Sequence, residues 1–179
     1  RSGKRDQLRN RLLLFSEPGA QEVEERITKA GRLSFTTFFS EAIAGGDYAF
    51  SPVSTPQGEG GQADVSAVEK AAASIAEAMD GPLVIVNKST VPIGTGDMVS
   101  EIVASHNNHH RADIASNPEF LREGTALQDF MHPDRVVIGS HELAVAEKGA
   151  KLYEPLDAPV LITDLYHCAT MQHPSDDYR

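Results

Sequence analysis

The sequence predicts an α/β fold in which a mostly parallel sheet is flanked by helices. Three observations lead to this prediction. Segments with helical and with strand periodicity alternate along the chain. The segment 83–87 opens with a run of apolar residues, which is typical of a strand buried on both faces. Polar and turn-forming residues follow directly after the strand patterns, at the positions where ligands bind in open sheets of this class.

The first part of the chain contains two helical and two strand patterns. A helix is predicted over 21–30, where two apolar residues lie four positions apart on one helical face. A strand is predicted over 33–36, a short helix over 37–44 and a further strand over 48–53.

A longer helical pattern begins at Ser66. Ser66 and Glu69 have the spacing of a capping box, in which each side chain bonds to the other residue's backbone N–H. One apolar stripe of this helix is predicted to face the core, formed by Val68, Ala72, Ile75 and Met79.

The second half of the chain continues the alternation. Thr95 is expected to cap a helix over 95–105 that contains Met98 and Ile102. The remaining predicted elements are strands over 83–87, 112–116, 135–139 and 160–163 and a helix over 141–153.

Length and composition narrow the class of protein. A chain of 179 residues with 40% hydrophobic residues suits one domain with its own core. The net charge of −10 argues against a nucleic-acid partner, and no apolar run has the roughly 20 residues of a membrane span. The single cysteine excludes an intramolecular disulfide framework and favours a reducing cytoplasm.

The densest cluster of candidate site residues follows the predicted strand 112–116. Glu119 and Glu123 lie four residues apart, which places both carboxylates on one face of a helical segment. Such a pair in isolation is more typical of a solvated helix surface. Here Phe120 and Leu121 interrupt the charges, and Arg122 and Arg135 are available to balance carboxylates or to meet a phosphate. The stretch therefore favours a binding or catalytic loop.

A second cluster, KSTVPIGT, follows the predicted strand 83–87. It places Lys88 beside the hydroxyls of Ser89 and Thr90, and then turns the chain into a helix. A strand, a polar turn and a helix N-terminus together form the geometry of an anion or phosphate site. The same pattern fits an ordinary loop between strand and helix equally well.

Two other groups of chemically active residues favour structural roles. His106, His109 and His110 follow a predicted helix with no adjacent pair of acids or cysteine, so no metal site is expected. Cys168 and His167 are neighbours in sequence, which is poor geometry for a nucleophile and its base.

Together these motifs resemble the UDP-glucose/GDP-mannose dehydrogenase family over residues 17–165. The matching motifs, in chain order, are EPG at 17–19, GRLSFTT at 31–37, STP at 54–56, ADVS at 63–66, KSTVPIGT at 88–95, SNPEFLREG at 116–124, DFMHPDRVVIG at 129–139 and APVLITD at 158–164. The resemblance implies a Rossmann-like fold with NAD as cofactor. It implies oxidation of the C6 alcohol of UDP-glucose to the carboxylate of UDP-glucuronate in two successive hydride transfers, as a step toward polysaccharides.

The resemblance also implies roles for individual residues. Thr90, Glu119 and Glu123 match catalytic positions: the threonine holds a water, Glu119 acts on protons through it, and Glu123 lies near nicotinamide and substrate. Thr55, Ser89, Thr90 and Glu123 match positions beside the cofactor. Glu119, Phe120, Leu121 and Arg122 match the strip that lines the nucleotide sugar. A homo-oligomer is expected for the complete enzyme.

The chain departs from the family pattern at several places. The family's first strand with its GxGYVG loop is not found, so the first βαβ element is expected to be missing. The motif of the family's catalytic cysteine and the UDP-binding half are also not found. Pro52 is unsuited to a central strand, and Ser54 replaces a glycine that lies close to the cofactor phosphates in the family.

We therefore interpret residues 1–165 as an incomplete NAD-binding domain and residues 166–179 as a divergent tail. Two alternatives stay open from the sequence. One is a relative that acts on GDP-mannose or a UDP-N-acetylhexosamine. The other is a non-catalytic remnant that binds nucleotide weakly or serves only as an interaction domain.

Overall fold

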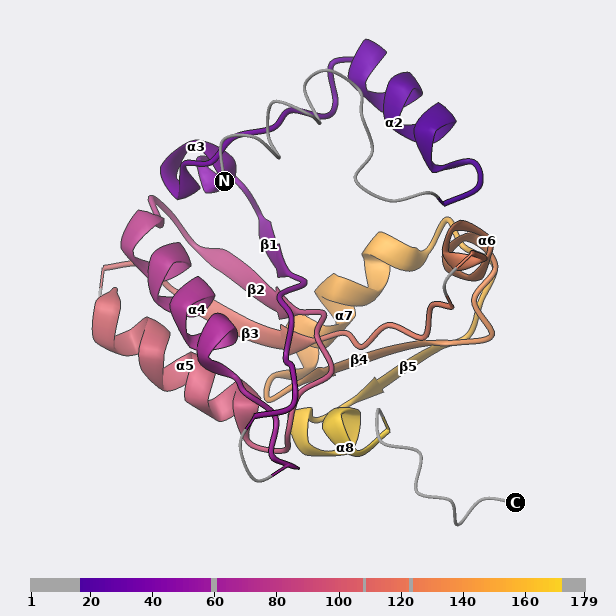
Figure 1. Ribbon diagram of the computed structural model, residues 1–179. Helices are drawn as coiled ribbons and strands as arrows, with labels where there is room; N and C mark the ends of the chain where they lie inside the picture. Colours follow the sequence, from indigo (N-terminus) through magenta and orange to yellow (C-terminus); the bar gives the residue numbers. More distant parts are fainter. Residues whose placement is uncertain (1–16, 59–60, 108, 123, 172–179) are drawn as a thin grey trace.

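The sheet at the centre of the protein has five strands, and most of its strand pairs are parallel. The computed structural model describes residues 17–58, 61–107, 109–122 and 124–171 (Figure 1). The strand order along the sheet follows the chain order. The strands are β1 (Tyr48–Ser51), β2 (Leu83–Asn87), β3 (Ala112–Ser116), β4 (Val136–Ser140) and β5 (Val160–Thr163).

One pair of strands breaks the parallel arrangement. β1, β2 and β3 run parallel to one another, and β4 runs parallel to β5. β4 is antiparallel to β3 and pairs only at the end of each strand, through Ala115 with Ser140 and Ser116 with Gly139. The rest of β4 therefore extends past the end of β3, alongside the loop that follows β3.

Helices cover both faces of this sheet. The helices are α2 (Ala20–Lys29), α3 (Phe39–Ile43), α4 (Ser66–Ala78), α5 (Thr95–His106), α6 (Ala126–Met131), α7 (Leu143–Ala150) with the 3-10 turn η2 (Lys151–Tyr153), and α8 (Leu165–Thr170). α4 and α5 lie together on one face, and α7 lies on the other (Figure 1). The fold expected from the sequence, a mostly parallel sheet flanked by helices, is confirmed.

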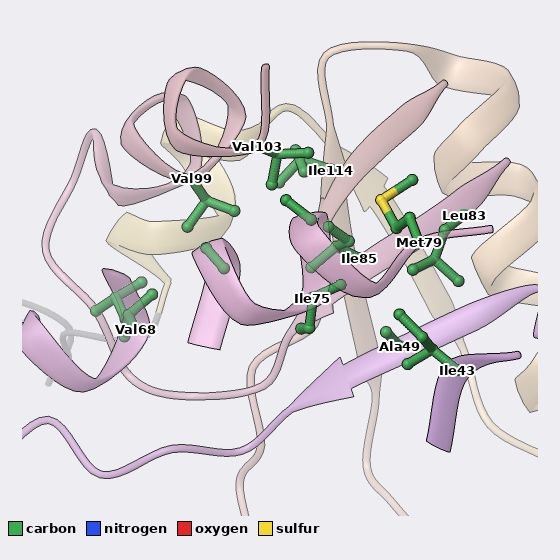
Figure 2. Close-up of a cluster of buried hydrophobic side chains, with 13 residues drawn as sticks. Ile43, Ala49, Val68, Ile75, Met79, Leu83, Ile85, Val99, Val103 and Ile114 are labelled. Atoms are coloured by element: carbon green, nitrogen blue, oxygen red, sulfur yellow. The ribbon is translucent and has the colours of Figure 1, made fainter. Parts of the chain in front are cut away.

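Alternate residues of β2 face different cores, as strand geometry requires. Leu83 and Ile85 pack with the apolar stripes of α4 and α5 in the cluster that Figure 2 shows. Val84 and Val86 pack on the opposite face with Val145 of α7. Burial on both faces explains why this strand has no polar residue before Asn87.

The inward stripe predicted for α4 is confirmed. Val68, Ala72, Ile75 and Met79 are all buried, and they belong to the same cluster as Leu83 and Ile85 of β2 (Figure 2). Met98 and Ile102 of α5 are only partly buried against this cluster, whereas Val99 and Val103 of the same helix are fully inside it.

The predicted strand over 33–36 is wrong. This segment has no regular secondary structure, and it pairs with no strand in the part of the chain that the structure describes. A strand needs a neighbour for its backbone N–H and C=O groups, and local residue preference does not supply one.

Two predicted helix caps are also wrong. Ser66 is the first residue of α4, and the carboxylate of Asp64 accepts its backbone N–H at 2.9 Å, so the capping box with Glu69 does not form. At α5 the cap is Gly94, whose φ of 88° lies in the left-handed region that glycine favours. The Thr95 hydroxyl instead donates to the carbonyl of Pro92 at 2.8 Å.

Two element boundaries differ from the prediction for physical reasons. The strand expected over 48–53 ends at Ser51, directly before Pro52, which has no N–H to donate to a ladder. The helix expected over 141–153 is divided into α7 and the tighter turn η2.

Gly139 lies where α8 packs against β4, and there is no room for a side chain at this position. A Cβ atom at this position would lie 2.4 Å from the Cβ of Cys168 in α8 and 2.6 Å from the carbonyl oxygen of Asp164. We therefore expect Gly139→Ala to lower the free energy of unfolding by about 1–3 kcal/mol, since backbone would have to move. Denaturant unfolding of the purified chain measures this change.

Gly81 offers a matched control for that substitution. Its Cβ position has no heavy atom within 4 Å, and its φ is not positive. Gly81→Ala should leave the unfolding midpoint almost unchanged. Equal midpoints for the two variants would contradict the close packing of α8 on β4.

Candidate functional site

The ends of β2 and β3 bring Thr90 and Glu119 to the same edge of the sheet. The two strands are parallel neighbours, with Asn87 opposite Ser116. The backbone N–H of Asn117 donates to the carbonyl of Asn87 at 2.9 Å, which continues the pairing past the strands. Thr90 and Glu119 each follow three residues after the paired positions, where ligand crevices form in sheets of this kind. Their chemical roles stay predictions.

The hydroxyl groups predicted to lie beside the cofactor join the ends of β1 and β2. The Thr55 hydroxyl donates to the carbonyl of Thr90 at 2.7 Å. The Ser89 hydroxyl lies 2.5 Å from the carbonyl of Val53, and Ser89 is buried. These contacts fix the two loops to each other, so the exposed side chain of Thr90 is the hydroxyl best placed to meet a ligand.

A cavity of about 540 Å³ lies beside the loop that follows β3. It contains the strip predicted to line the substrate, namely Glu119, Phe120, Leu121 and Arg122. The other side of the cavity is formed by the residues around β4 and by η2, including Arg135, Val136 and Tyr153. The cavity therefore exists because β4 extends past the end of β3.

Lys88 enters this cavity from the end of β2 and is held there by Asn117. Its ammonium nitrogen lies 3.3 Å from Oδ1 of Asn117, and the hydroxyl of Tyr153 donates to the same oxygen. The Asn117 amide nitrogen donates to the carbonyl of Val137 at 2.8 Å. Burial lowers the pKa of Lys88, although the nearby charge of Glu119 raises it.

Arg122 is bound within the loop. Its guanidinium donates to both carboxylate oxygens of Asp129, at 2.7 Å and 3.1 Å, and its backbone N–H donates to Asp129 as well. These bonds hold the pKa of Asp129 well below its usual range. Since this charge is already balanced, Arg122 serves first to shape the loop.

Glu17 of the EPG motif holds the other end of the same loop. Its carboxylate accepts the backbone N–H groups of Gly124 and Leu127, at 3.1 Å and 3.3 Å. These contacts join the start of the described chain to the first turn of α6. The EPG motif and the loop after β3 are therefore in contact, although they are more than a hundred residues apart in sequence.

The remaining predicted residues are placed as follows. Phe120 is exposed and lies under the guanidinium of Arg135, which is 5.6 Å from the ring centroid. Leu121 is exposed on the cavity wall. Glu123 lies outside the described residues, as do residues 1–16 and 172–179. The division predicted between residues 165 and 166 falls at the start of α8 and stays a prediction.

Cys168 is fully buried and has a structural role in the described fold. Its sulfur lies 3.5 Å from the carbonyl of Ser116, and burial raises the pKa of the thiol. The preceding residue, His167, directs its ring elsewhere, and its Nδ1 bonds to the carboxylate of Asp164 at 2.7 Å. Within the described ranges, no group of three or more His, Cys, Asp or Glu residues could bind a metal.

Two residues of the cavity were not identified as site residues from the sequence. Asn117 occurs in the sequence analysis only within the SNPEFLREG motif, and Tyr153 only as the last residue of the helix expected over 141–153. The apolar run before Asn117 was a signal for its burial. No local signal connects Tyr153 to Asn117, because the contact joins positions 36 residues apart.

The residues present fit one wall of an NAD site. The loops after β1 and β2 lie side by side, with the side chains of Ser54 and Thr90 exposed on them. Such a wall can bind the cofactor through hydroxyl and backbone groups. The glycine-rich turn that meets the pyrophosphate in dinucleotide-binding folds does not occur in these 179 residues.

Asp129 provides a test of how the loop is held. We expect Asp129→Asn to destabilise the protein at pH 7, because the ion pair with Arg122 is lost. The lowered pKa of Asp129 means that its contribution is present at neutral pH and is lost as pH falls below about 4.

Thermal unfolding of both proteins between pH 7 and pH 3 measures this dependence. The difference in melting temperature should stay nearly constant from pH 7 to about pH 4 and shrink below that pH. Asp157→Asn is the matched control, since Asp157 forms no ion pair in the described part of the chain. A constant difference for Asp129→Asn across the range would contradict the role of its charge.

Comparison with protein families shows where this architecture belongs. Residues 2–157 match the model of the UDP-glucose/GDP-mannose dehydrogenase family, NAD binding domain. UDP-glucose 6-dehydrogenase TuaD of Bacillus subtilis is 38% identical over 172 residues, which cover 96% of this chain and 37% of that protein. UDP-glucose 6-dehydrogenase of Pseudomonas aeruginosa is 41% identical over 152 residues, which cover 83% of this chain and 34% of that protein.

Solved structures agree with this result. A UDP-glucose dehydrogenase from Pyrobaculum islandicum superimposes with a TM-score of 0.91 at 37% identity, over 96% of this chain and 41% of that one. A GDP-mannose dehydrogenase from Pseudomonas aeruginosa gives the same TM-score of 0.91 at 28% identity, with the same coverage. The chain thus spans about two fifths of the relatives it matches. It belongs to the UDP-glucose/GDP-mannose dehydrogenase family and corresponds to that family's NAD binding domain.

Proposed function

We propose that this chain forms the NAD-binding part of an enzyme that oxidises the C6 alcohol of UDP-glucose to UDP-glucuronate. The observation that carries the proposal is the position of Thr90 and Glu119. They follow paired strands at one sheet edge, and Glu119 lines a cavity of about 540 Å³. That volume lies within the range of sites for small ligands and cofactors.

The chain's own residues would divide the work on the substrate. The carboxylate of Glu119 takes the proton that the C6 hydroxyl loses, and the hydroxyl of Thr90 orients a water beside the reacting carbon. Phe120 and Leu121 present apolar surface to the nucleotide sugar, while Arg122 keeps the loop in shape through Asp129. Two NAD molecules, bound one after the other, would each accept one hydride, one for each oxidation.

The cofactor would lie against the loops after β1 and β2. We assign Thr55, Ser89 and Thr90 to this contact, and Glu123 to the space between nicotinamide and substrate. The bonds of Thr55 and Ser89 to neighbouring carbonyls support a contact through their backbone rather than through their hydroxyls.

UDP-glucose is the substrate that the relatives favour. The two curated relatives described above carry that substrate in their names. The GDP-mannose dehydrogenase of Pseudomonas aeruginosa has the same fold at lower identity, so a different nucleotide sugar is the alternative.

We also propose a cytoplasmic enzyme of polysaccharide biosynthesis that is a homo-oligomer when complete. The buried free thiol of Cys168 supports a reducing compartment. No helix in the described part of the chain is both long and apolar enough to cross a membrane.

The role of Glu119 is tested by Glu119→Gln in the complete enzyme. This change keeps the shape of the side chain and removes its ability to exchange a proton. We expect kcat to fall by about 10²-fold or more, with binding of UDP-glucose nearly unchanged. Turnover within a few-fold of the parent enzyme would make Glu119 a structural acid.

The 179 residues alone are expected not to release UDP-glucuronate. A covalent second oxidation needs an accessible thiolate, and Cys168 is buried with a raised thiol pKa. Incubation with UDP-glucose and excess NAD, followed by NADH absorbance and chromatography, tests this expectation. Sustained NADH formation that Glu119→Gln abolishes would show that these residues suffice.

A further inference from the structure

Glu119 and Lys88 line the cavity beside the loop after β3, and neither forms an ion pair among the described residues. Glu119 is exposed on the cavity wall, and its carboxylate has no hydrogen bond or ion pair among the described residues. The ammonium of Lys88 has one hydrogen bond acceptor within the same ranges, the Asn117 side chain, although it can donate three bonds. Of the other charges, Arg122 is paired with Asp129, whereas Arg135, which lies over Phe120, and Asp134 form no ion pair among the described residues.

The buried side chain of Asn117 fixes the position of Lys88. Asn117 is only 2% exposed, and its amide nitrogen is held by the carbonyl of Val137 in β4. Its Oδ1 atom therefore points toward Lys88 and Tyr153 and receives a bond from each. A buried amide that makes three side-chain hydrogen bonds is a rigid support.

The charge of Glu119 affects the pKa of Lys88. Burial lowers the pKa of Lys88, and the charge of Glu119 is the one that opposes this shift. The two groups come from neighbouring strands and line one cavity. The charge of Glu119 therefore changes the free energy of ionising Lys88.

We propose that Lys88 and Glu119 act as a pair of opposite charges across this cavity, in which Lys88 is the positioning residue that holds the Glu119 carboxylate on the cavity side of the loop. This inference deepens the proposed function and rests on it for the role of Glu119. The hydrogen bond to Asn117, whose oxygen also accepts the Tyr153 hydroxyl, keeps the ammonium in the cavity.

The other titratable and charged groups that face this pair belong to the loop after β3, to the start of β4 and to η2. They are Arg122, Asp129, His132, Asp134, Arg135 and Tyr153. Two of these groups are carboxylates. Asp129 is bound by Arg122, so Asp134 is the carboxylate whose removal serves as a control for losing a negative charge from the cavity.

The pair can be tested on the 179-residue chain without any activity measurement. Acetylation of Lys88 by acetic anhydride, followed by peptide mass spectrometry over a pH series, gives the midpoint at which its amine becomes reactive. In Glu119→Gln the midpoint should move to lower pH by about 0.5 unit, which is about threefold faster labelling below the midpoint. Asp134→Asn is the control and should leave the midpoint within about 0.1 unit.

Equal midpoints in Glu119→Gln and the parent chain would overturn the pair, whatever the enzyme does. Both substitutions affect exposed side chains, so the fold is kept. In the complete enzyme, Lys88→Met should lower kcat, and Lys88→Arg, which keeps the positive charge, should restore it. A shifted midpoint together with an unchanged kcat in Lys88→Met would leave the pair in place and reject the proposed role of Glu119.

Discussion

The buried side chain of Asn117 is the contact on which the arrangement of the site depends. Its backbone N–H extends the pairing of β3 with β2, and its amide nitrogen binds β4 through Val137. Its amide oxygen receives Lys88 and the hydroxyl of Tyr153. One residue thus joins β2, β3, β4 and η2. Replacing it would leave several buried polar groups without partners, and each of these costs about 1–3 kcal/mol.

The antiparallel β4 leaves space for a ligand beside the loop that follows β3. It pairs with only the last residues of β3 and continues alongside the loop from Pro118 to Arg122. Pro118 is buried next to Asn117, and Glu17 and Asp129 hold the remainder of the loop. The cavity is therefore formed by a fixed loop and a strand, rather than by side chains that happen to separate.

The sequence predicts those features that depend on local patterns. The buried run of β2 and the stripe of α4 could be identified because periodicity and burial are linked. The strand expected over 33–36 failed because pairing needs a partner that local preference does not reveal. The caps at Ser66 and Thr95 failed because Asp64 and Gly94 compete at neighbouring positions. Lys88 was noticed as a cation, but its support by Tyr153 joins distant parts of the chain and has no local signature.

The charges of the site separate into those that build the loop and those that remain for a ligand. Arg122, Asp129 and Glu17 have conspicuous side chains in the loop motifs, yet their bonds are used within the protein. A group that is fully bonded must break those bonds to act on a substrate, and each bond to a charged group stabilises the fold by about 1.5–3 kcal/mol. Among the described contacts, the Glu119 carboxylate has no such bond, and the Lys88 ammonium has one, to Asn117. These two side chains can therefore interact with a ligand, whereas the guanidinium of Arg122 is already bonded to Asp129 and holds the loop in its conformation.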